Sequence, residues 1–266
     1  MLTLVEHCTK LEELKLSEIG KLTDSWLKHL YQLTLLRSLT LSRPSESLTD
    51  EPIIELLGSI GTRLEHLDLS GNDELTDMTL QDGIRKSCTS LQSLALSGIT
   101  QLTDDGAAAF FKQWKQDEGT FYKPKITEDG MDVDFPVTNR PLSSIDLSQN
   151  PELGTNALLA LLEHSGPELL KLSINGWRST QEMALNAFTK YAPKLEEVDV
   201  GWCREVDDLT IGKLLGMGQK DEDRRSAGCV NLKVLKVYGC NKVTRACPTR
   251  VRGLSPLHST GADTLQ

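Results

Sequence analysis

The sequence lacks the short motifs that mark the commonest catalytic and cofactor sites. Gly216 and Gly218 are followed by Gln219-Lys220 rather than by the Gly-Lys-Ser/Thr of a phosphate-binding loop, and no Gly-x-Ser-x-Gly nucleophile elbow occurs. The five histidines are His7, His29, His66, His164 and His258, and no two of them have the spacing of a pair of metal ligands. We therefore expect a protein that is not an enzyme, with no catalytic, cofactor-binding or metal-binding residue.

Long apolar runs and closely paired cysteines are missing too. No run reaches the length of a membrane span, and the charged stretch from Glu6 to Lys10 stands where a signal peptide would have its apolar core. No C-x-x-C pair occurs among the six cysteines, which are Cys8, Cys88, Cys203, Cys229, Cys240 and Cys247. We expect reduced, mostly buried thiols rather than disulfides or a zinc site.

A surplus of basic residues is also absent. The chain of 266 residues has 29 Lys and Arg against 38 Asp and Glu, a net charge of −9. Because nucleic-acid binding depends on clustered Lys and Arg, we do not expect this chain to bind DNA directly. Arg245, Arg250 and Arg252 form one local basic group, which we expect to be solvated.

The sequence does contain a leucine pattern, Leu-x-x-Leu-x-Leu-x-x-Asn/Cys, that recurs about every 26 residues. Its copies begin at Leu11, Leu36, Leu64, Leu91, Leu142, Leu169, Leu195 and Leu232. Two intervals break the period, with 51 residues from Leu91 to Leu142 and 37 from Leu195 to Leu232. Repetition of this kind predicts a leucine-rich-repeat solenoid.

Each copy predicts a short strand followed by a helical segment that returns the chain to the next strand. The expected fold class is therefore α/β, a horseshoe with parallel strands on its concave face and helices on its convex face. We assign residues 1–250 to this domain, with insertions near 115–141 and 216–229, and expect residues 251–266 to form a disordered tail. The first insertion suits either a partner contact or a disordered loop.

Polar residues recur at two fixed positions of the repeat. One set precedes the helical patterns and is predicted to form helix N-caps: Asp24, Asp50, Asp77, Asp104 and Asp208. The other set fills the Asn/Cys position, where a side chain turns inward and satisfies buried backbone groups: Asn72, Asn150, Cys203 and Cys240. Ile19, Pro44, Ile99 and Trp177 occupy that position elsewhere, which predicts an imperfect ladder.

The concave face is the expected place of function. Each strand contributes three outward residues, from Glu13, Lys15 and Ser17 in the first repeat to Val234, Lys236 and Tyr238 in the last, with Trp202 nearby. This surface is small, polar and mildly acidic, which favours a protein partner with basic or polar groups over a face that is merely soluble. The predicted binding residues are His66, Asp68, Asp146, Lys171, Asp199, Lys236 and Tyr238.

The combination of Asn and Cys with a period near 26 resembles the cysteine-containing subclass of leucine-rich repeats found in ubiquitin-ligase receptors. Within that group, residues 195–208 (LEEVDVGWCREVDD) and 232–244 (LKVLKVYGCNKVT) resemble the closing repeats of the fungal nucleotide-excision-repair leucine-rich-repeat proteins, the "radiation-sensitivity seven" family. Residues 67–77 (LDLSGNDELTD) are similar to that family's central repeats. The resemblance covers roughly residues 1–250.

The resemblance implies a non-catalytic scaffold in a nuclear complex that recognises DNA damage and is linked to ubiquitin ligation. Implied partners are a helicase-like, DNA-dependent ATPase with a RING finger, and elongin and cullin components. The alternative is the substrate-receptor repeats of an F-box-type, cullin-based ubiquitin ligase. The expected location of the chain is the nucleus, or both the nucleus and the cytoplasm. The chain opens inside a repeat, so we expect a fragment whose first repeat is uncapped and prone to fray or associate.

Overall fold

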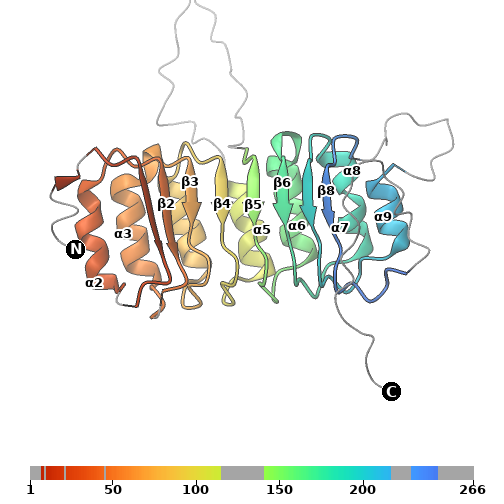
Figure 1. The fold of residues 1–266 in the computed structure, drawn as a ribbon, viewed down its shortest axis with the longest axis horizontal. Coiled ribbons are helices and arrows are strands. Elements are labelled where there is room, and N and C mark those ends of the chain that lie inside the picture. Colours follow the sequence, from red (N-terminus) through yellow and green to blue (C-terminus); the bar gives the residue numbers. More distant parts are fainter. Residues whose placement is uncertain are drawn as a thin grey trace, which may run out of the picture.

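The computed structural model describes residues 7–244 apart from residues 9, 21, 45, 115–140 and 217–228. Eight short strands form one parallel sheet in chain order, so that each repeat pairs only with its neighbours (Figure 1). The strands are β1 (Glu13–Ser17), β2 (Ser38–Ser42), β3 (His66–Asp68), β4 (Ser93–Ala95), β5 (Ser144–Asp146), β6 (Lys171–Ser173), β7 (Glu197–Asp199) and β8 (Val234–Lys236). The predicted solenoid is confirmed.

Helices cover the other face of the sheet (Figure 1). They are α2 (Asp24–Leu27), α3 (Asp50–Ile60), α4 (Arg85–Ser87), α5 (Asp104–Gln113), α6 (Thr155–Ser165), α7 (Glu182–Asn186), α8 (Phe188–Tyr191) and α9 (Asp208–Leu214). Short 3-10 turns η1 (Lys28–Gln32), η2 (Gly61–Arg63) and η4 (Gly166–Glu168) and a π-helical segment η3 (Thr79–Ile84) complete the returns.

The leucines of the repeat form the core between the two layers. Leu36, Leu39 and Leu41 are at most 1% exposed, and the matching leucines of the other central repeats are equally buried. Burying one such side chain contributes about 1.5–3 kcal/mol, so the repeated leucines supply most of the driving force for folding. The aromatic helix residues Phe110, Trp114 and Phe188 fill the same core.

The residue before the Asn/Cys position has a left-handed backbone in all eight repeats, with φ between 49° and 84°. These residues are Glu18, Arg43, Gly71, Gly98, Gln149, Gly176, Trp202 and Gly239. In seven of them the backbone N–H donates to a carbonyl of the next repeat at 2.7–3.0 Å, as Trp202 does to Tyr238. The turn thereby extends the parallel pairing beyond the strands, and we call this row of residues the rim.

The Asn/Cys position forms the ladder that the sequence predicts. Asn72 donates to the carbonyls of Leu41 and Leu69 at 2.8 and 2.7 Å and accepts from the N–H of Leu48. Asn150 makes the equivalent bonds to Leu96, Leu147 and Ile99. The thiols of Cys203 and Cys240 donate to Ile174 and Val200 at 3.2 Å. Burial raises the pKa of Cys203 to about 12 and that of Cys240 to about 11, which keeps both as neutral donors.

The predicted N-caps are wrong by one residue. Asp24, Asp50, Asp104 and Asp208 are the first helical residues, and the caps are Thr23, Thr49, Thr103 and Asp207. Asp77 likewise already lies within a helical stretch. The correction has a physical reason, because each of these aspartates accepts hydrogen bonds from the following repeat. Asp50, for example, accepts from the N–H and hydroxyl of both Thr76 and Thr79.

The long interval after β4 does not interrupt the sheet, because Ser93, Leu94 and Ala95 of β4 pair directly with Ser144, Ile145 and Asp146 of β5. His164 and Ser165 of α6 form hydrogen bonds with Trp114 and Leu142, the residues on either side of this interval. The N–H of Leu142 donates to Ser165 Oγ at 3.0 Å, Ser165 Oγ lies 2.7 Å from His164 Nδ1, and His164 Nε2 donates to the carbonyl of Trp114 at 2.9 Å.

The predicted insertions near 115–141 and 216–229 fall mainly, and the tail 251–266 wholly, outside the described residues. Their boundaries therefore stay predictions. No helix in the described ranges is long and apolar enough to cross a membrane.

Candidate protein-binding face

The outward residues of the strands form continuous rows across what we call the sheet face, the side of the sheet away from the helices. Parallel register aligns each residue with the same repeat position on the next strand, so Glu13 lies beside Ser38 and Asp199 beside Lys236. Three shallow hollows of about 300–480 Å³ lie along this face. A row of open, polar hollows suits contact with another macromolecule better than enclosure of a small ligand.

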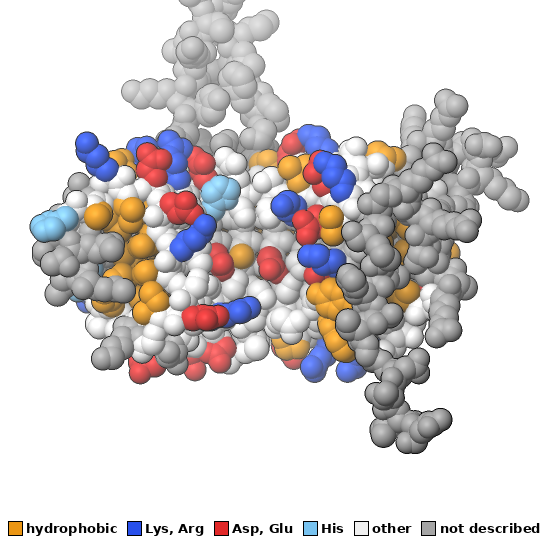
Figure 2. All heavy atoms as spheres, viewed as in Figure 1, with side chains coloured by type: hydrophobic (Ala, Val, Ile, Leu, Met, Phe, Trp, Pro, Cys, Tyr) orange, Lys and Arg blue, Asp and Glu red, His pale blue; other side chains and the backbone are white. Residues whose placement is uncertain are grey.

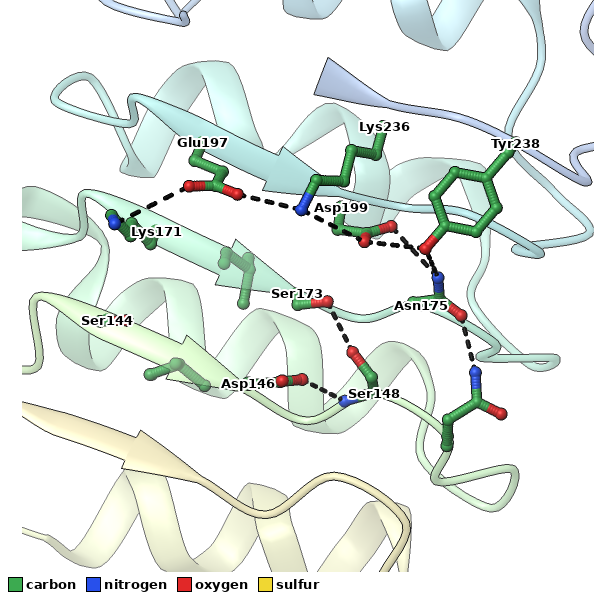
Figure 3. Close-up of a pocket in the computed structure, with 13 residues that line it drawn as sticks. Ser144, Asp146, Ser148, Lys171, Ser173, Asn175, Glu197, Asp199, Lys236 and Tyr238 are labelled. Carbon is green, nitrogen blue, oxygen red and sulfur yellow. Dashed lines mark hydrogen bonds and ion pairs between the residues drawn. The ribbon is translucent and has the colours of Figure 1, made fainter. Parts of the chain in front are cut away.

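One hollow, of about 440 Å³, lies over β5 to β8 and brings together five of the predicted binding residues (Figure 3). These are Asp146, Lys171, Asp199, Lys236 and Tyr238. His66 and Asp68 lie in a second hollow over the first four strands, and Asp68 also lines a third hollow together with Asp146, so the predicted set is spread over three hollows rather than one compact site.

Asp199 is the centre of a hydrogen-bond network in the C-terminal hollow (Figure 3). Its Oδ1 accepts from the N–H of Gly201 at 3.0 Å and from Asn175 Nδ2 at 3.3 Å, and its Oδ2 accepts from the hydroxyl of Tyr238 at 3.1 Å. Burial, followed by the charge of Asp199, raises the pKa of Tyr238 to about 12, so the hydroxyl stays a donor at neutral pH. The network fixes Tyr238 against the sheet, with 44% of its surface exposed.

The two lysines of this hollow are paired. Lys236 Nζ lies 3.1 Å from Glu197 Oε1 and 3.9 Å from Asp199 Oδ2, and Lys171 Nζ lies 3.8 Å from Glu197 Oε2. The lysine side chains are 61% and 44% exposed, whereas Glu197 is 31% and Asp199 only 12% exposed, so it is the lysines that remain open to exchange with charges on a partner. Glu197, which the sequence placed on this face but not among the binding residues, bridges both lysines.

Sequence reasoning missed the contribution of the rim to this site. Gln149 Nε2 donates to Asn175 Oδ1 at 2.8 Å and connects the rim to the Asp199 network. Trp202 is 60% exposed, and its ring lies where a side chain on Gly239 would otherwise project, because an added Cβ there would be 2.4 Å from the ring. The glycine of the next repeat thus provides the space for an exposed aromatic. The available signal was the alternation of a large residue and glycine before the Asn/Cys position in the last four repeats, namely Gln149, Gly176, Trp202 and Gly239.

The described part of the sheet face has no cluster of side chains that could hold a metal ion. No group of three or more His, Cys, Asp or Glu side chains with metal-binding geometry occurs among the described residues. Cys8, Cys88, Cys203, Cys229 and Cys240 are free thiols, and the last four are buried. The face thus offers hydrogen bonds, charges and two exposed aromatic rings for recognition.

Comparisons with known proteins agree with this architecture. A family model described as a leucine-rich repeat matches residues 62–77. The chain is 32% identical over 209 residues to the DNA repair protein rhp7 of Schizosaccharomyces pombe, covering 78% of this chain and 33% of rhp7. It is 30% identical over 211 residues to the DNA repair protein RAD7 of Saccharomyces cerevisiae, covering 77% of this chain and 31% of RAD7. The chain spans about a third of the length of these relatives.

Solved structures show the same likeness. The yeast Rad7 and Elc1 complex matches with a TM-score of 0.69 and 25% identity, covering 95% of this chain and 56% of the matched one. Internalin C2 of Listeria monocytogenes matches with a TM-score of 0.51 and 16% identity, covering 91% of this chain and 78% of internalin, and shares the solenoid fold alone.

Proposed function

Because this chain is homologous to the Rad7 and Rhp7 family of DNA repair proteins, we propose that it is a non-catalytic scaffold in a nuclear complex that recognises DNA damage. The homology carries the proposal. Supporting it is the open, polar sheet face, whose shallow hollows suit contact with another macromolecule. The chemistry of the complex would then reside in the partners.

A link to ubiquitin ligation follows as part of the same proposal. One solved relative is Rad7 in complex with Elc1, and we expect a component of that kind as a partner of this chain. The second expected partner, a DNA-dependent ATPase with a RING finger, is the one that the family resemblance of the sequence implies. We propose that the sheet face holds one of these partners through the C-terminal hollow, where Lys171, Lys236 and Tyr238 are exposed at least in part.

Affinity purification of the chain from fungal nuclear extract, with mass spectrometry of the proteins that co-purify, tests this proposal. The experiment compares the unchanged chain with a sheet-face variant, Lys171→Ala with Lys236→Ala. The matched control is Lys86→Ala with Lys213→Ala, which removes two charges from the helical layer. We expect the ATPase with the unchanged chain and the control, and less of it with the sheet-face variant.

Two outcomes would count against the proposal. Recovery of an F-box adaptor and its cullin without the ATPase would move the chain to the substrate receptors of another ligase. Equal recovery with all three proteins would place the contact away from the C-terminal hollow.

A further inference from the structure

Three aspartates of the sheet face repeat at an interval of two strands. From β3 to β7 the register aligns Asp68, Ala95, Asp146, Ser173 and Asp199 in one row. Neighbouring strands lie about 4.8 Å apart, so successive aspartates are separated by about 10 Å across the sheet. A single small residue stands between each pair, and Asp68 and Asp146 are half-buried, whereas Asp199 is 9% exposed. We call these five residues the aspartate row.

The three carboxylates are held in the same way. Each accepts a hydrogen bond at Oδ1 from the backbone N–H two residues later: Asp68 from Ser70 at 2.9 Å, Asp146 from Ser148 at 2.9 Å and Asp199 from Gly201 at 3.0 Å. This shared turn fixes the side-chain direction and leaves Oδ2 as the second acceptor. The surroundings of one carboxylate can therefore serve as a guide to the other two.

Only the third carboxylate finds a donor for Oδ2 inside the described chain. Asp199 Oδ2 accepts from the hydroxyl of Tyr238 at 3.1 Å and lies 3.9 Å from Lys236 Nζ. Over the described ranges, no hydrogen bond or ion pair reaches Oδ2 of Asp68 or Asp146. At Asp199 the second carboxylate oxygen thus binds a hydroxyl donor and lies near an ammonium group. We expect donors of this kind at Oδ2 of Asp68 and Asp146.

The charge balance of the sheet face points to a cationic group. The strands present five carboxylates and three lysines on this face. The lysines pair with Glu13, Glu197 and Asp199, since Lys15 lies 2.5 Å from Glu13 and the other two lysines lie in the C-terminal hollow. Asp68 and Asp146 are the carboxylates left over, and Figure 2 shows acidic side chains in the middle of this face among uncharged ones.

The space between the two carboxylates fits a side chain from outside. A hollow of about 300 Å³ includes Asp68, Ala95 and Asp146 in its lining and has the small residues Ser70 and Ser97 beside them. Arg43 also lines it, but its guanidinium lies 3.8 Å from Glu18 on the rim. Arginine suits this site best, because its planar guanidinium donates in a fork that matches a carboxylate and is weakly hydrated.

We propose that Asp68 and Asp146 bind two basic side chains, preferably arginines, of an extended protein segment that crosses the sheet face along the aspartate row. The inference rests on the proposed function only in taking the partner to be a protein. It adds the chemistry that this partner must carry, which is two cationic side chains about 10 Å apart.

Fluorescence anisotropy of a labelled peptide of four Arg-Ser-Ser repeats, whose successive arginines are about 10 Å apart in an extended chain, is measured as the purified chain is added at low salt and tests the inference. The variant Asp68→Asn with Asp146→Asn keeps the shape of both side chains and their Oδ1 bonds. Its matched control, Asp82→Asn with Glu168→Gln, removes two charges from the helical layer, where both carboxylates pair with lysines. We expect the sheet-face variant to weaken binding about tenfold or more, because two charge-assisted hydrogen bonds are lost. The control should change affinity less than about threefold.

Equal weakening in both variants would overturn the inference, since it would show attraction to net charge alone. So would unchanged binding by the sheet-face variant, provided that urea unfolding shows both variants to be folded. Peptide binding by the purified chain does not depend on the repair complex. Failure of co-purification and failure of this titration are therefore separate results.

Discussion

At the scale of the residue, the carbonyl at the last apolar position of the strand pattern in five repeats accepts a hydrogen bond from a side chain of the repeat that follows. Asn72, Cys203 and Cys240 supply it, and Trp177 does so as well, because its indole Nε1 donates to the carbonyl of Leu147 at 2.8 Å. An amide, a thiol and an indole are chemically unlike, yet each donates one hydrogen in the same direction. The acceptor position, rather than the residue type, is what the repeats share.

The Asn72 amide is expected to be among the most sensitive single groups in the chain. Asn72→Ala would leave two carbonyls and one N–H unsatisfied in a fully buried site, so the free energy of unfolding should fall by about 3 kcal/mol. Urea denaturation measures this. Asn231→Ala is the control, because Asn231 is exposed and donates only to the carbonyl of Pro193 at 3.3 Å. Similar losses in both variants would contradict the role of the ladder.

At the scale of the element, the strands and their register were predictable, because the leucine pattern fixes which residues face the core and repetition aligns them. The rows of the sheet face follow from the same logic. The contacts within those rows were not predictable, since the bond from Tyr238 to Asp199 joins residues 39 positions apart and depends on side-chain reach. The helix caps were misplaced for a related reason. Thr and Asp both favour the cap, and the partners of the aspartates lie one repeat away.

The aspartate that opens α3 gives a pH-dependent prediction. Burial would raise the pKa of Asp50, but hydrogen bonds from Thr76 and Thr79 outweigh it and hold the pKa below its ordinary 3.8. A lowered carboxyl pKa stabilises the fold above pH 3.8, and the stabilisation is lost as the pH falls from there through the folded-state pKa. At pH 7, Asp50→Asn should lower the free energy of unfolding by about 1–2 kcal/mol, with the difference shrinking below about pH 4.

Urea unfolding of both proteins between pH 3 and 7 checks this dependence. Glu51→Gln is the matched control, because it removes one charge from the same helical turn and its side chain is exposed. A constant difference between Asp50→Asn and the unchanged chain at every pH would sink the explanation.

Two glycines give opposite predictions for the same substitution. Gly239→Ala should lower the free energy of unfolding by about 1–2 kcal/mol, because φ is 72° and the new methyl group would displace the Trp202 ring. Gly58→Ala should raise it by about 0.5–1 kcal/mol, because Gly58 lies on the exposed side of α3 with nothing within 4 Å of an added Cβ. Thermal melts of the two variants test this pair of predictions. Destabilisation by both substitutions would contradict the prediction for Gly58.

At the scale of the whole molecule, each strand pairs only with its neighbours in the sheet, so stability is expected to be greatest where there is a neighbour on both sides. Hydrogen exchange followed by mass spectrometry should show stronger amide protection in β3 to β6 than in β1 and β8. The last strand is the clearest case, because Val234 is 39% exposed and β8 pairs with β7 alone over the described residues. Uniform protection across all eight strands would instead indicate one cooperative unit.

The hydrogen bonds of His164 and Ser165 hold the residues on both sides of the long interval after β4, which affects how such a chain can change in evolution. Trp114 and Leu142 are both hydrogen-bonded to α6, and β4 pairs with β5 in the ordinary register. The geometry of the described repeats therefore does not depend on how many residues join Trp114 to Leu142. Descendants of one gene can lengthen, shorten or exchange it while the rest of the solenoid keeps its geometry, and an experimenter can use the same seam to graft a fluorescent or affinity label.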